Sequence, residues 1–320
     1  MISKLASRMD ILSESMTIAI STLARDLKES GKDIISFSAG EPDFDTPQKI
    51  KDAAIEALNT AKTKYTAVAG TAEVKSAIVT KLKNENNLTY NSCDIMVNVG
   101  AKHSLFNIFQ AIIDEGDEVI IPAPYWVTYP ELAKYSGGIP VEIQTNDASE
   151  FKMTASQLKD AITPKTKMLI LTTPSNPTGS VYSKKELQEI AKVLEGTNIW
   201  VISDEMYEKL IYDGLEFTAT ASISDDMYQR TITVNGLSKS VAMTGWRFGY
   251  LATPHQELIK AMTKLQSQST SNINSITQHA SITALLGEVN DEIEMMRLEF
   301  EKRRNVPVKC DRQLWQTSSM

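Results

Sequence analysis

The sequence predicts an α/β protein in which a mostly parallel sheet is sandwiched by helices. Short apolar segments bounded by turn residues alternate with segments of helical periodicity through the middle of the chain. This alternation is typical of parallel strands joined by helical crossovers. The length of 320 residues exceeds what one hydrophobic core usually organises. A large domain with a smaller partner is therefore expected.

Five short segments, several rich in valine and isoleucine, have the character of buried parallel strands. They are residues 95–99, 118–121, 168–171, 199–202 and 231–234. After Gly100, apolar residues recur with the i, i+3, i+4, i+7 spacing of an amphipathic helix, at Leu105, Ile108, Phe109 and Ile112. A last helix is expected over residues 288–304, with Pro307 ending it.

The composition excludes several classes of protein. Hydrophobic residues make up 42% and charged residues 23% of the chain, which is typical of a globular protein. A formal net charge of −7 without runs of like charge argues against nucleic acid as a partner. The two cysteines and three histidines lack metal-ligand spacing, so no metal is expected. Without an apolar run of spanning length, we expect a cytoplasmic protein with no membrane partner.

Two strand ends bear groups that could bind a ligand. Gly100, Ala101 and Lys102 join a strand to a helix N-terminus, where phosphate binds readily, although most parallel α/β domains have such a turn. Asp204 follows the strand 199–202, with Tyr207 three positions later. Asp204 could be a structural acid or a helix cap, but ligands commonly bind at this end of a strand.

The segment after the strand 231–234 is the most informative of the chain. Lys239 stands there among small and apolar neighbours, and burial lowers the pKa of a lysine toward that of a nucleophilic amine. Arg247 adds a planar fork suited to phosphate. An aldehyde-reactive amine, a carboxylate, an arginine and an anion-binding helix end together indicate a phosphorylated aromatic aldehyde with a ring nitrogen, pyridoxal 5′-phosphate.

Longer motifs strengthen this interpretation. The segments FSAGEPDFDTP, PAPYWVTYPE, TTPSNPTG, SDEMYEKL and GLSKSVAMTGWRFGY resemble those of the fold-type I class I and II aminotransferases, nearest to the bacterial aspartate aminotransferases. The resemblance extends from about residue 5 to about residue 304. It implies the fold of pyridoxal-phosphate-dependent transferases, with a sheet of seven strands.

The resemblance assigns roles around the cofactor ring. Lys239 is implied as the Schiff-base lysine and as the base that moves the substrate Cα proton. Asp204 is implied to pair with the ring nitrogen, while Asn176 and Tyr207 bond the phenolic oxygen and Trp126 stacks on the ring.

The phosphate ligands follow from the same resemblance. They are Arg247, the amides of Gly100 and Ala101 beside Lys102, and Tyr65 from a second subunit, which implies a homodimer. Many relatives have a hydroxyl where this chain has Gly236, so Ser238 is only a possible substitute.

The substrate side is also implied. Gly40 and Asn176 are expected at the α-carboxylate, Lys102 at a distal carboxylate, Thr17 nearby, and Trp126 against the substrate. A solvated lysine remains the alternative for Lys102. Pro124 and Pro177 occupy positions where relatives have cis peptide bonds.

The expected activity is ping-pong transfer of the amino group of L-aspartate to 2-oxoglutarate. A transaminase for aromatic, prephenate or alanine substrates, a β-lyase on the same cofactor, and a non-catalytic cofactor-binding remnant are the alternatives. A nicotinamide-dependent enzyme is disfavoured because no GxGxxG motif is present.

Three domain segments are expected. Residues 1–45 would form an N-terminal arm and part of a small domain, residues 46–285 the cofactor domain, and residues 286–320 the start of a C-terminal small domain. The end of the chain, VPVKCDRQLWQTSSM, has neither a strand nor a helix pattern and matches nothing in the family. Arg312 is therefore not assigned to the substrate-carboxylate arginine of relatives, and truncation with impaired activity is expected.

Overall fold

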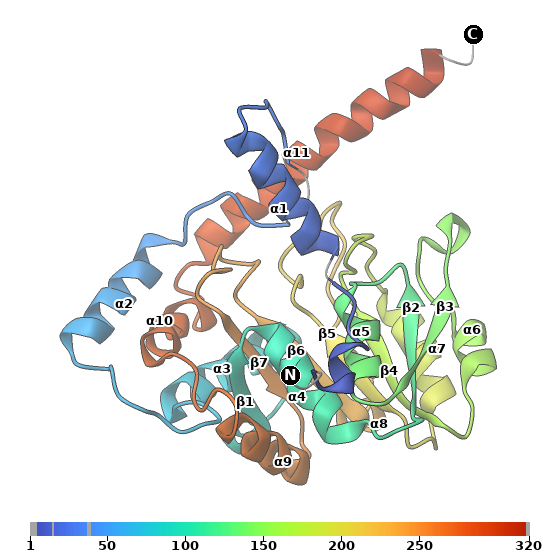
Figure 1. Cartoon of the computed structure of the whole chain (residues 1–320), viewed down its shortest axis with the longest axis horizontal. Helices are drawn as coiled ribbons and strands as arrows, with labels where there is room; N and C mark the ends of the chain where they lie inside the picture. Colours follow the sequence, from blue (N-terminus) through green and yellow to red (C-terminus); the bar gives the residue numbers. More distant parts are fainter. Residues whose placement is uncertain (1–4, 15, 37–39, 318–320) are drawn as a thin grey trace.

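A seven-stranded sheet lies at the centre of the computed structural model, which describes residues 5–14, 16–36 and 40–317 (Figure 1). The strands are β1 (Ile95–Val99), β2 (Glu118–Ala123), β3 (Ile139–Gln144), β4 (Thr166–Thr172), β5 (Trp200–Asp204), β6 (Thr231–Gly236) and β7 (Phe248–Ala252). Their spatial order is β1-β7-β6-β5-β4-β2-β3. The predicted α/β class and the five predicted strands are confirmed, with ends shifted by one or two residues.

The direction of the strands decides where their ends meet. β7 runs antiparallel to both of its neighbours, β1 and β6, whereas the other pairs are parallel. The carboxyl ends of β1 to β6 therefore lie at one edge of the sheet, together with the beginning of β7. Ligand sites of open α/β sheets are found at this edge.

Two strands, β3 and β7, are not among those predicted from the sequence. β3 lies at the edge of the sheet and alternates apolar residues at Ile139, Val141 and Ile143, a period-2 pattern that would have identified it. β7 follows Arg247 directly, without a connecting helix. The alternation of strands and helices used for the prediction does not reveal an antiparallel strand of this kind.

Helices cover both faces of the sheet. In chain order, the helices are α1 (Met16–Glu29), which lies apart from the sheet, α2 (Gln48–Asn59), α3 (Ala72–Asn86), α4 (Ala101–Ile112), α5 (Thr128–Tyr135), α6 (Ala155–Ala161), α7 (Lys184–Leu194), α8 (Asp225–Arg230), α9 (Gln256–Ser267), α10 (Ser275–Leu285) and α11 (Asn290–Thr317). Short 3-10 turns cover Ser7–Met9, Ser92–Asp94, Asp147–Ser149 and Thr220–Ser222. The predicted helix after Gly100 is α4.

Three apolar clusters make up the core. One cluster joins α4, α5 and α9 to one face of the sheet, which we call the site face. The other two join α2, α3 and α10, and α6, α7 and α8, to the opposite face, which we call the far face. Local sequence fixes several helix starts, as at Ser183, whose side chain accepts from the Glu186 amide 3.3 Å away while the Glu186 carboxylate bonds back.

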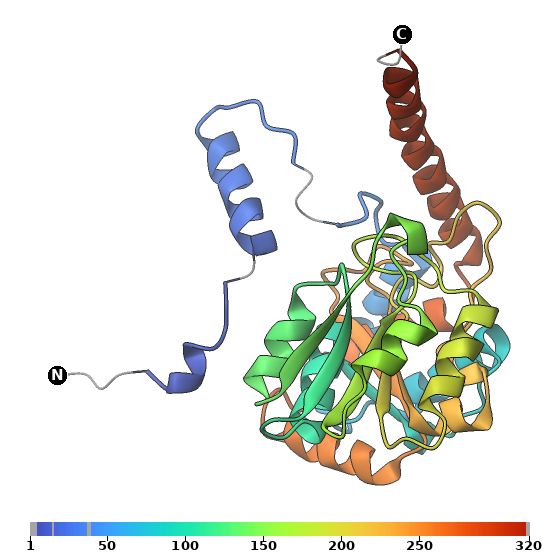
Figure 2. The same cartoon turned by 90° about the vertical axis from the view of Figure 1, so that its right-hand side faces the viewer.

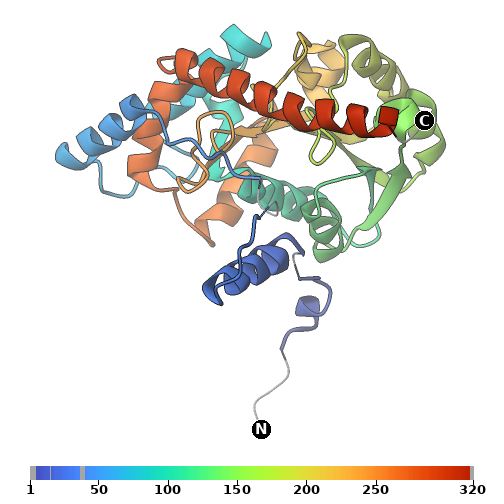
Figure 3. The same ribbon diagram turned by 90° about the horizontal axis from the view of Figure 1, so that it is seen from above.

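The two terminal helices extend from this body. Figures 2 and 3 show α1 apart from the sheet, and Figures 1 and 2 show α11 running beyond the sheet. Ser13, ahead of α1, donates its amide hydrogen to the Glu131 carboxylate of α5 at 2.7 Å. No helix in the described ranges has the length and apolar character needed to cross a membrane.

The prediction that Pro307 ends the last helix is wrong. The expectation that the residues after Pro307 form no helix is wrong as well. α11 continues through Pro307 to Thr317. A proline removes one helical hydrogen bond and crowds the preceding turn, but its fixed φ is close to that of a helix, so a helix can continue through it at a cost. The first part of α11 packs against the rest of the chain through an apolar face, since Ile293 and Met296 are buried and the ring of Phe300 lies 5.3 Å from that of Phe44, centroid to centroid.

Candidate active site

The edge where the strands end collects most of the residues singled out from the sequence. Each comes from a different strand end, so the sheet alone brings them to one edge. They are Gly100 after β1, Trp126 after β2, Asn176 after β4, Asp204 at the end of β5, Lys239 after β6 and Arg247 before β7. This convergence makes the edge the candidate active site.

The first turn of α4 and the Arg247 guanidinium meet at one corner of this site. A Cβ atom at Gly100 would lie 2.5 Å from Arg247 Nη2, so only glycine allows the guanidinium to lie against the backbone there. A Cβ atom at Gly249 would lie 2.3 Å from the Ala101 nitrogen, so β7 also needs glycine to pack against this turn. The amides of a helix start and an arginine fork favour an anion such as phosphate, although the Gly100 amide bonds the Asn98 carbonyl at 2.8 Å.

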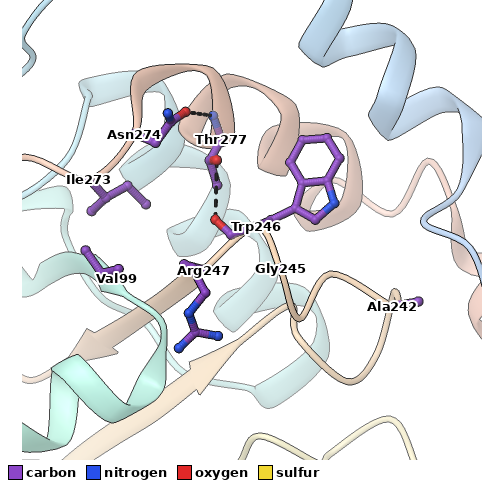
Figure 4. Close-up of a pocket in the computed structure, with 8 residues that line it drawn as sticks. All are labelled: Val99, Ala242, Gly245, Trp246, Arg247, Ile273, Asn274 and Thr277. Carbon is purple, nitrogen blue, oxygen red and sulfur yellow. Dashed lines mark hydrogen bonds between the residues drawn. The ribbon is translucent and has the colours of Figure 1, made fainter. Parts of the chain in front are cut away.

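Arg247 adopts a left-handed backbone conformation, with a φ of 57°. Such a conformation is uncommon for a residue with a side chain, and it is held here by the surrounding turn. Arg247 Nη1 donates to the Thr244 carbonyl at 2.9 Å. Arg247 also borders an open hollow of about 580 Å³. The residues that line it are Val99, Ala242, Gly245, Trp246, Arg247, Ile273, Asn274 and Thr277 (Figure 4).

Lys239 is half-buried in the loop after β6, where its Nζ donates to the Gly40 carbonyl. Burial lowers its pKa, and the nearby Arg247 charge lowers it further, against the opposing effect of Glu41. Both effects favour the uncharged amine that a nucleophile or base needs. The hydrogen bond between Thr244 and Glu41 fastens the Gly40 segment to the same loop.

Asp204 is buried at the end of β5 and is bonded through both oxygens. Its Oδ2 accepts from the Tyr129 hydroxyl at 2.8 Å, and its Oδ1 accepts from the Met206 amide at 3.2 Å. Burial raises the pKa of Asp204, while these two hydrogen bonds lower it. The pKa of Asp204 stays raised on balance, and the two hydrogen bonds stabilise the ionised form against part of the loss of solvent.

Polar and aromatic groups complete the edge. Asn176 Nδ2 donates to the Tyr207 hydroxyl at 3.4 Å, and burial together with Asp204 raises the pKa of Tyr207 to about 12. The Lys102 ammonium lies 4.8 Å from the centroid of the Trp126 ring. Burial and Arg247 lower the pKa of Lys102. A neutral phenol, an amide and a flat aromatic side chain thus border the same space.

The remaining residues from the sequence analysis have different positions. Tyr65 is 91% exposed, and Ser238 is buried. Thr17 belongs to α1, but its side chain lies outside those the structure describes. Ala123-Pro124 and Asn176-Pro177 are cis as predicted, and Thr173-Pro174, which was not predicted, is cis as well.

The sequence analysis did not single out Tyr129 and Thr172. The Tyr129 hydroxyl lies 2.8 Å from Thr172 Oγ1 as well as bonding Asp204. The available signal was weak: a tyrosine in an apolar helix face needs a partner for its hydroxyl, but nothing local identifies that partner.

The donors at this edge fit a phosphorylated pyridine aldehyde. A half-buried amine suits the aldehyde, a buried and bonded carboxylate suits a ring nitrogen that carries a proton, and a guanidinium beside a helix start suits the phosphate. The glycine at position 100 lets the Arg247 guanidinium lie against the backbone of the helix start, which brings two kinds of phosphate donor together. Each of these chemical demands is met by a residue at the same sheet edge.

Known proteins are similar to this chain in sequence and in fold. The family model for aminotransferase class I and II matches residues 32–309. The aspartate aminotransferase of Bacillus sp. (strain YM-2) is 50% identical over 299 residues, which are 93% of this chain and 76% of that protein. The aspartate/prephenate aminotransferase of Cereibacter sphaeroides is 48% identical over 295 residues, covering 92% of this chain and 73% of that protein.

A solved structure agrees with these sequence matches. The aspartate aminotransferase from Thermus thermophilus, solved with maleate, superposes with a TM-score of 0.93 at 40% identity. The superposition covers 96% of this chain and 80% of that chain. Since the similarity includes the sheet, its edge belongs to the shared part of the fold.

Proposed function

The chain belongs to the class I and II aminotransferases, a family that depends on pyridoxal 5′-phosphate, and we propose that it transfers the amino group of L-aspartate to 2-oxoglutarate. The observation that supports this most strongly is the convergence of Lys239, Asp204 and Arg247 at one sheet edge, each in an environment suited to one part of the cofactor.

Residues from several strand ends would hold the cofactor. Lys239 would bind its aldehyde carbon, and Arg247 with the Gly100 and Ala101 amides would bind its phosphate. Asp204 would pair with the ring nitrogen. The other groups near the ring would be Asn176, Tyr207, Trp126, Lys102 and Ser238. When bound, the cofactor supplies an electron sink that stabilises negative charge at the substrate Cα.

Lys239 is proposed to act as the general base. Its Nζ would take the proton from the substrate Cα and return a proton to the cofactor side, which requires an amine that is uncharged near neutral pH. Burial and Arg247 both lower the pKa of this amine and so support the role. Asp204 would hold the proton of the ring nitrogen in place throughout.

A dicarboxylic substrate is supported by the residues at the mouth of the site. Lys102 lies over Trp126, where its charge could meet a distal carboxylate. Gly40, Asn176 and Thr17 are proposed on the substrate side, and Gly40 already bonds Lys239. The relative from Bacillus is named an aspartate aminotransferase, which is consistent with this choice. The Thermus structure was solved with maleate, which is also a dicarboxylate.

Prephenate is the second candidate substrate. The relative from Cereibacter sphaeroides is named for both aspartate and prephenate. Prephenate also has two carboxylates, so the Lys102 charge would suit it as well. Supplying prephenate in place of 2-oxoglutarate, with aspartate as donor, tests whether this chain accepts it.

We also propose a homodimer in which Tyr65 reaches the phosphate of the partner's site. The loop that bears Tyr65 is held to α10 on either side, by Ser275 bonding the Lys62 carbonyl at 2.7 Å and by Gln278 bonding Thr66 at 3.0 Å, while Tyr65 itself is exposed. A rigid loop with an outward tyrosine supports a contact across an interface.

Mixing Tyr65→Ala with Lys239→Ala tests that contact. If Tyr65 acts across the interface, hybrid dimers contain one intact site, and the mixture exceeds the activity of either variant alone. A mixture no more active than its components would contradict it. Light scattering should give twice the chain mass of 35.5 kDa.

The domain division is proposed as residues 1–45 for the arm and part of a small domain, 46–285 for the cofactor domain, and 286–320 for the beginning of the C-terminal part. Limited proteolysis should cut first near residues 45 and 286 if this division is correct. A cytoplasmic location is also proposed, which cell fractionation tests.

The test of the activity is a substitution of Lys239. We expect Lys239→Ala to abolish oxaloacetate formation from aspartate and 2-oxoglutarate and to remove the visible absorbance change on cofactor binding. Lys264→Ala, at an exposed lysine of α9, is the matched control and should behave as the parent. Equal turnover by Lys239→Ala and the parent would reject the proposed function.

Donor preference tests the substrate. Aspartate should be preferred over phenylalanine and alanine, and Lys102→Ala should reduce that preference by about tenfold, the effect of losing one exposed charge contact. A parent enzyme that prefers an uncharged donor would reject the aspartate assignment while leaving the family and the cofactor in place.

A further inference from the structure

The Tyr129 hydroxyl links two strand ends beneath the site. Tyr129 is fully buried on α5, and its oxygen lies 2.8 Å from Asp204 Oδ2 at the end of β5 and 2.8 Å from Thr172 Oγ1 at the end of β4. Its ring meets Trp126 edge-on, with centroids 5.6 Å apart and an interplanar angle of 89°. One side chain thus contacts three elements of the site.

The single hydroxyl proton fixes the direction of this chain of hydrogen bonds. A phenol has one proton, and an ionised carboxylate can only accept, so Tyr129 donates to Asp204. The Thr172 hydroxyl must then donate to the Tyr129 oxygen. Hydrogen bonds in such a chain polarise one another, which strengthens the donor at the carboxylate.

The two bonds also set the orientation of Asp204. Tyr129 occupies one lone-pair position on Oδ2 and the Met206 amide occupies one on Oδ1. A carboxylate has about four acceptor positions, so others remain for a further donor. With both oxygens bonded, the carboxylate has little freedom to rotate.

We propose that Tyr129, supported by Thr172, is a positioning residue that keeps Asp204 ionised and oriented for the ring nitrogen of the cofactor. This inference rests on the proposed function, because it assigns Asp204 to that nitrogen. It explains why a hydroxyl is placed deep in an apolar cluster where phenylalanine would fill almost the same volume.

Burial alone does not account for the arrangement. Tyr250 is also fully buried, yet its hydroxyl has no hydrogen-bond partner among the described residues. Replacing each tyrosine by phenylalanine therefore gives a matched pair of variants. Tyr129→Phe loses a hydrogen bond, and Tyr250→Phe removes a hydroxyl that has no partner among the described residues. Thr172→Val and Thr172→Ser form a second matched pair, because only serine keeps the hydroxyl.

The primary experiment measures the pKa of Asp204 without cofactor. Carboxyl carbon NMR of selectively labelled protein gives this value, and Asp204→Asn assigns the signal. We expect Tyr129→Phe to raise the pKa of Asp204 by about one pH unit or more, since a hydrogen bond to a charged group is lost. Thr172→Val should raise it less, and Thr172→Ser and Tyr250→Phe should leave it unchanged.

The dissociation constant of the cofactor at neutral pH is the second readout. Tyr129→Phe should weaken binding by about tenfold if a tenth or less of Asp204 remains ionised. In the Asp204→Asn background the same substitution should have no further effect, because the group on which it acts is gone.

These outcomes separate the inference from the proposed function. An unchanged pKa of Asp204 in both Tyr129→Phe and Thr172→Val would overturn the positioning role. If Tyr129→Phe does not fold, the Thr172 pair decides alone. Cofactor binding that is unchanged in Asp204→Asn would instead reject the role proposed for Asp204, whatever the pKa shows.

Discussion

Two neighbouring carboxylates, Asp204 and Glu205, lie on opposite faces of the sheet and differ in their partners. Asp204 on the site face is bonded through both oxygens, to Tyr129 and Met206. Glu205 on the far face accepts twice at Oε1, from Ser203 Oγ at 2.8 Å and from the Thr220 amide at 3.2 Å, while its Oε2 has no partner among the described residues. Both are buried and both accept two hydrogen bonds, so they differ in whether both oxygens are bonded and in the charge of Glu208 near Glu205.

Burial raises the pKa of both groups. Burial, and then the nearby Glu208, raises the pKa of Glu205 to about 8, so this group is mostly neutral at neutral pH. Glu208 is buried too, but Lys81 and Asn86 hold its pKa below the ordinary value. At Glu205, two donors on one oxygen do not offset burial and the neighbouring Glu208 charge, whereas at Glu208 a contacting cation keeps the pKa low.

The largest expected effect is on the far face, where Lys81 pairs with Glu208. Lys81→Met leaves Glu208 buried without its cation, which should lower the free energy of unfolding by about 3 to 5 kcal/mol. Lys83→Met, two positions along the same helix but exposed, is the control. Denaturant unfolding measures both, and equal stability of the two variants would show that the pair is not important.

Activity should distinguish the two carboxylates directly. Asp204→Asn should lower kcat on the order of 10² to 10³-fold, as expected when a group that stabilises developing charge is lost. Glu205→Gln should stay within a few-fold of the parent, because Glu205 faces away from the site. Steady-state kinetics on both variants test this, and the reverse order would contradict the assignment of faces.

The pH dependence of stability should depend on Glu205. Its folded-state pKa of about 8 lies above the ordinary value of 4.5, so its stabilising contribution is complete below pH 4.5 and is lost as pH rises toward 8. The glutamine of Glu205→Gln cannot ionise. Between pH 4.5 and 8, the free energy of unfolding of the variant should therefore fall less steeply than that of the parent, by up to about 1.4 kcal/mol per pH unit. Unfolding measured at several pH values tests it; parallel curves for parent and variant would disprove the raised pKa.

The smallest expected effect is at Tyr250. Its hydroxyl is buried and unpartnered among the described residues, so Tyr250→Phe should change the free energy of unfolding by less than about 1 kcal/mol and can even stabilise the protein. Thermal unfolding measures the difference. A larger loss would indicate that the hydroxyl has a partner such as buried water, which would weaken the contrast with Tyr129.

Several residues of the site could be predicted because the signal is local. Lys239 stands alone among small and apolar residues after an apolar strand, and Asp204 directly follows another. Strand ends of a parallel sheet share an edge, so the pattern of strands already placed these residues together. The same logic failed for β7, which runs antiparallel and has no helix before it.

Pro307 shows the limit of local rules at the end of a helix. A proline disfavours the middle of a helix, and the sequence therefore predicted an end there, but α11 continues to Thr317. The rule expresses an energetic cost and not a prohibition. Strong helix formers on both sides can outweigh that cost.

The sequence by itself determined the fold class, the family resemblance, the cofactor and the residues at the strand ends. Only the tertiary structure decided that Tyr129 meets Asp204, 75 positions away, and Thr172, 43 positions away. It also brought Gly40 to Lys239 across 199 positions. Periodicity encodes which face of an element is buried, but the partner of a buried hydroxyl depends on which elements pack together, and no local pattern records that.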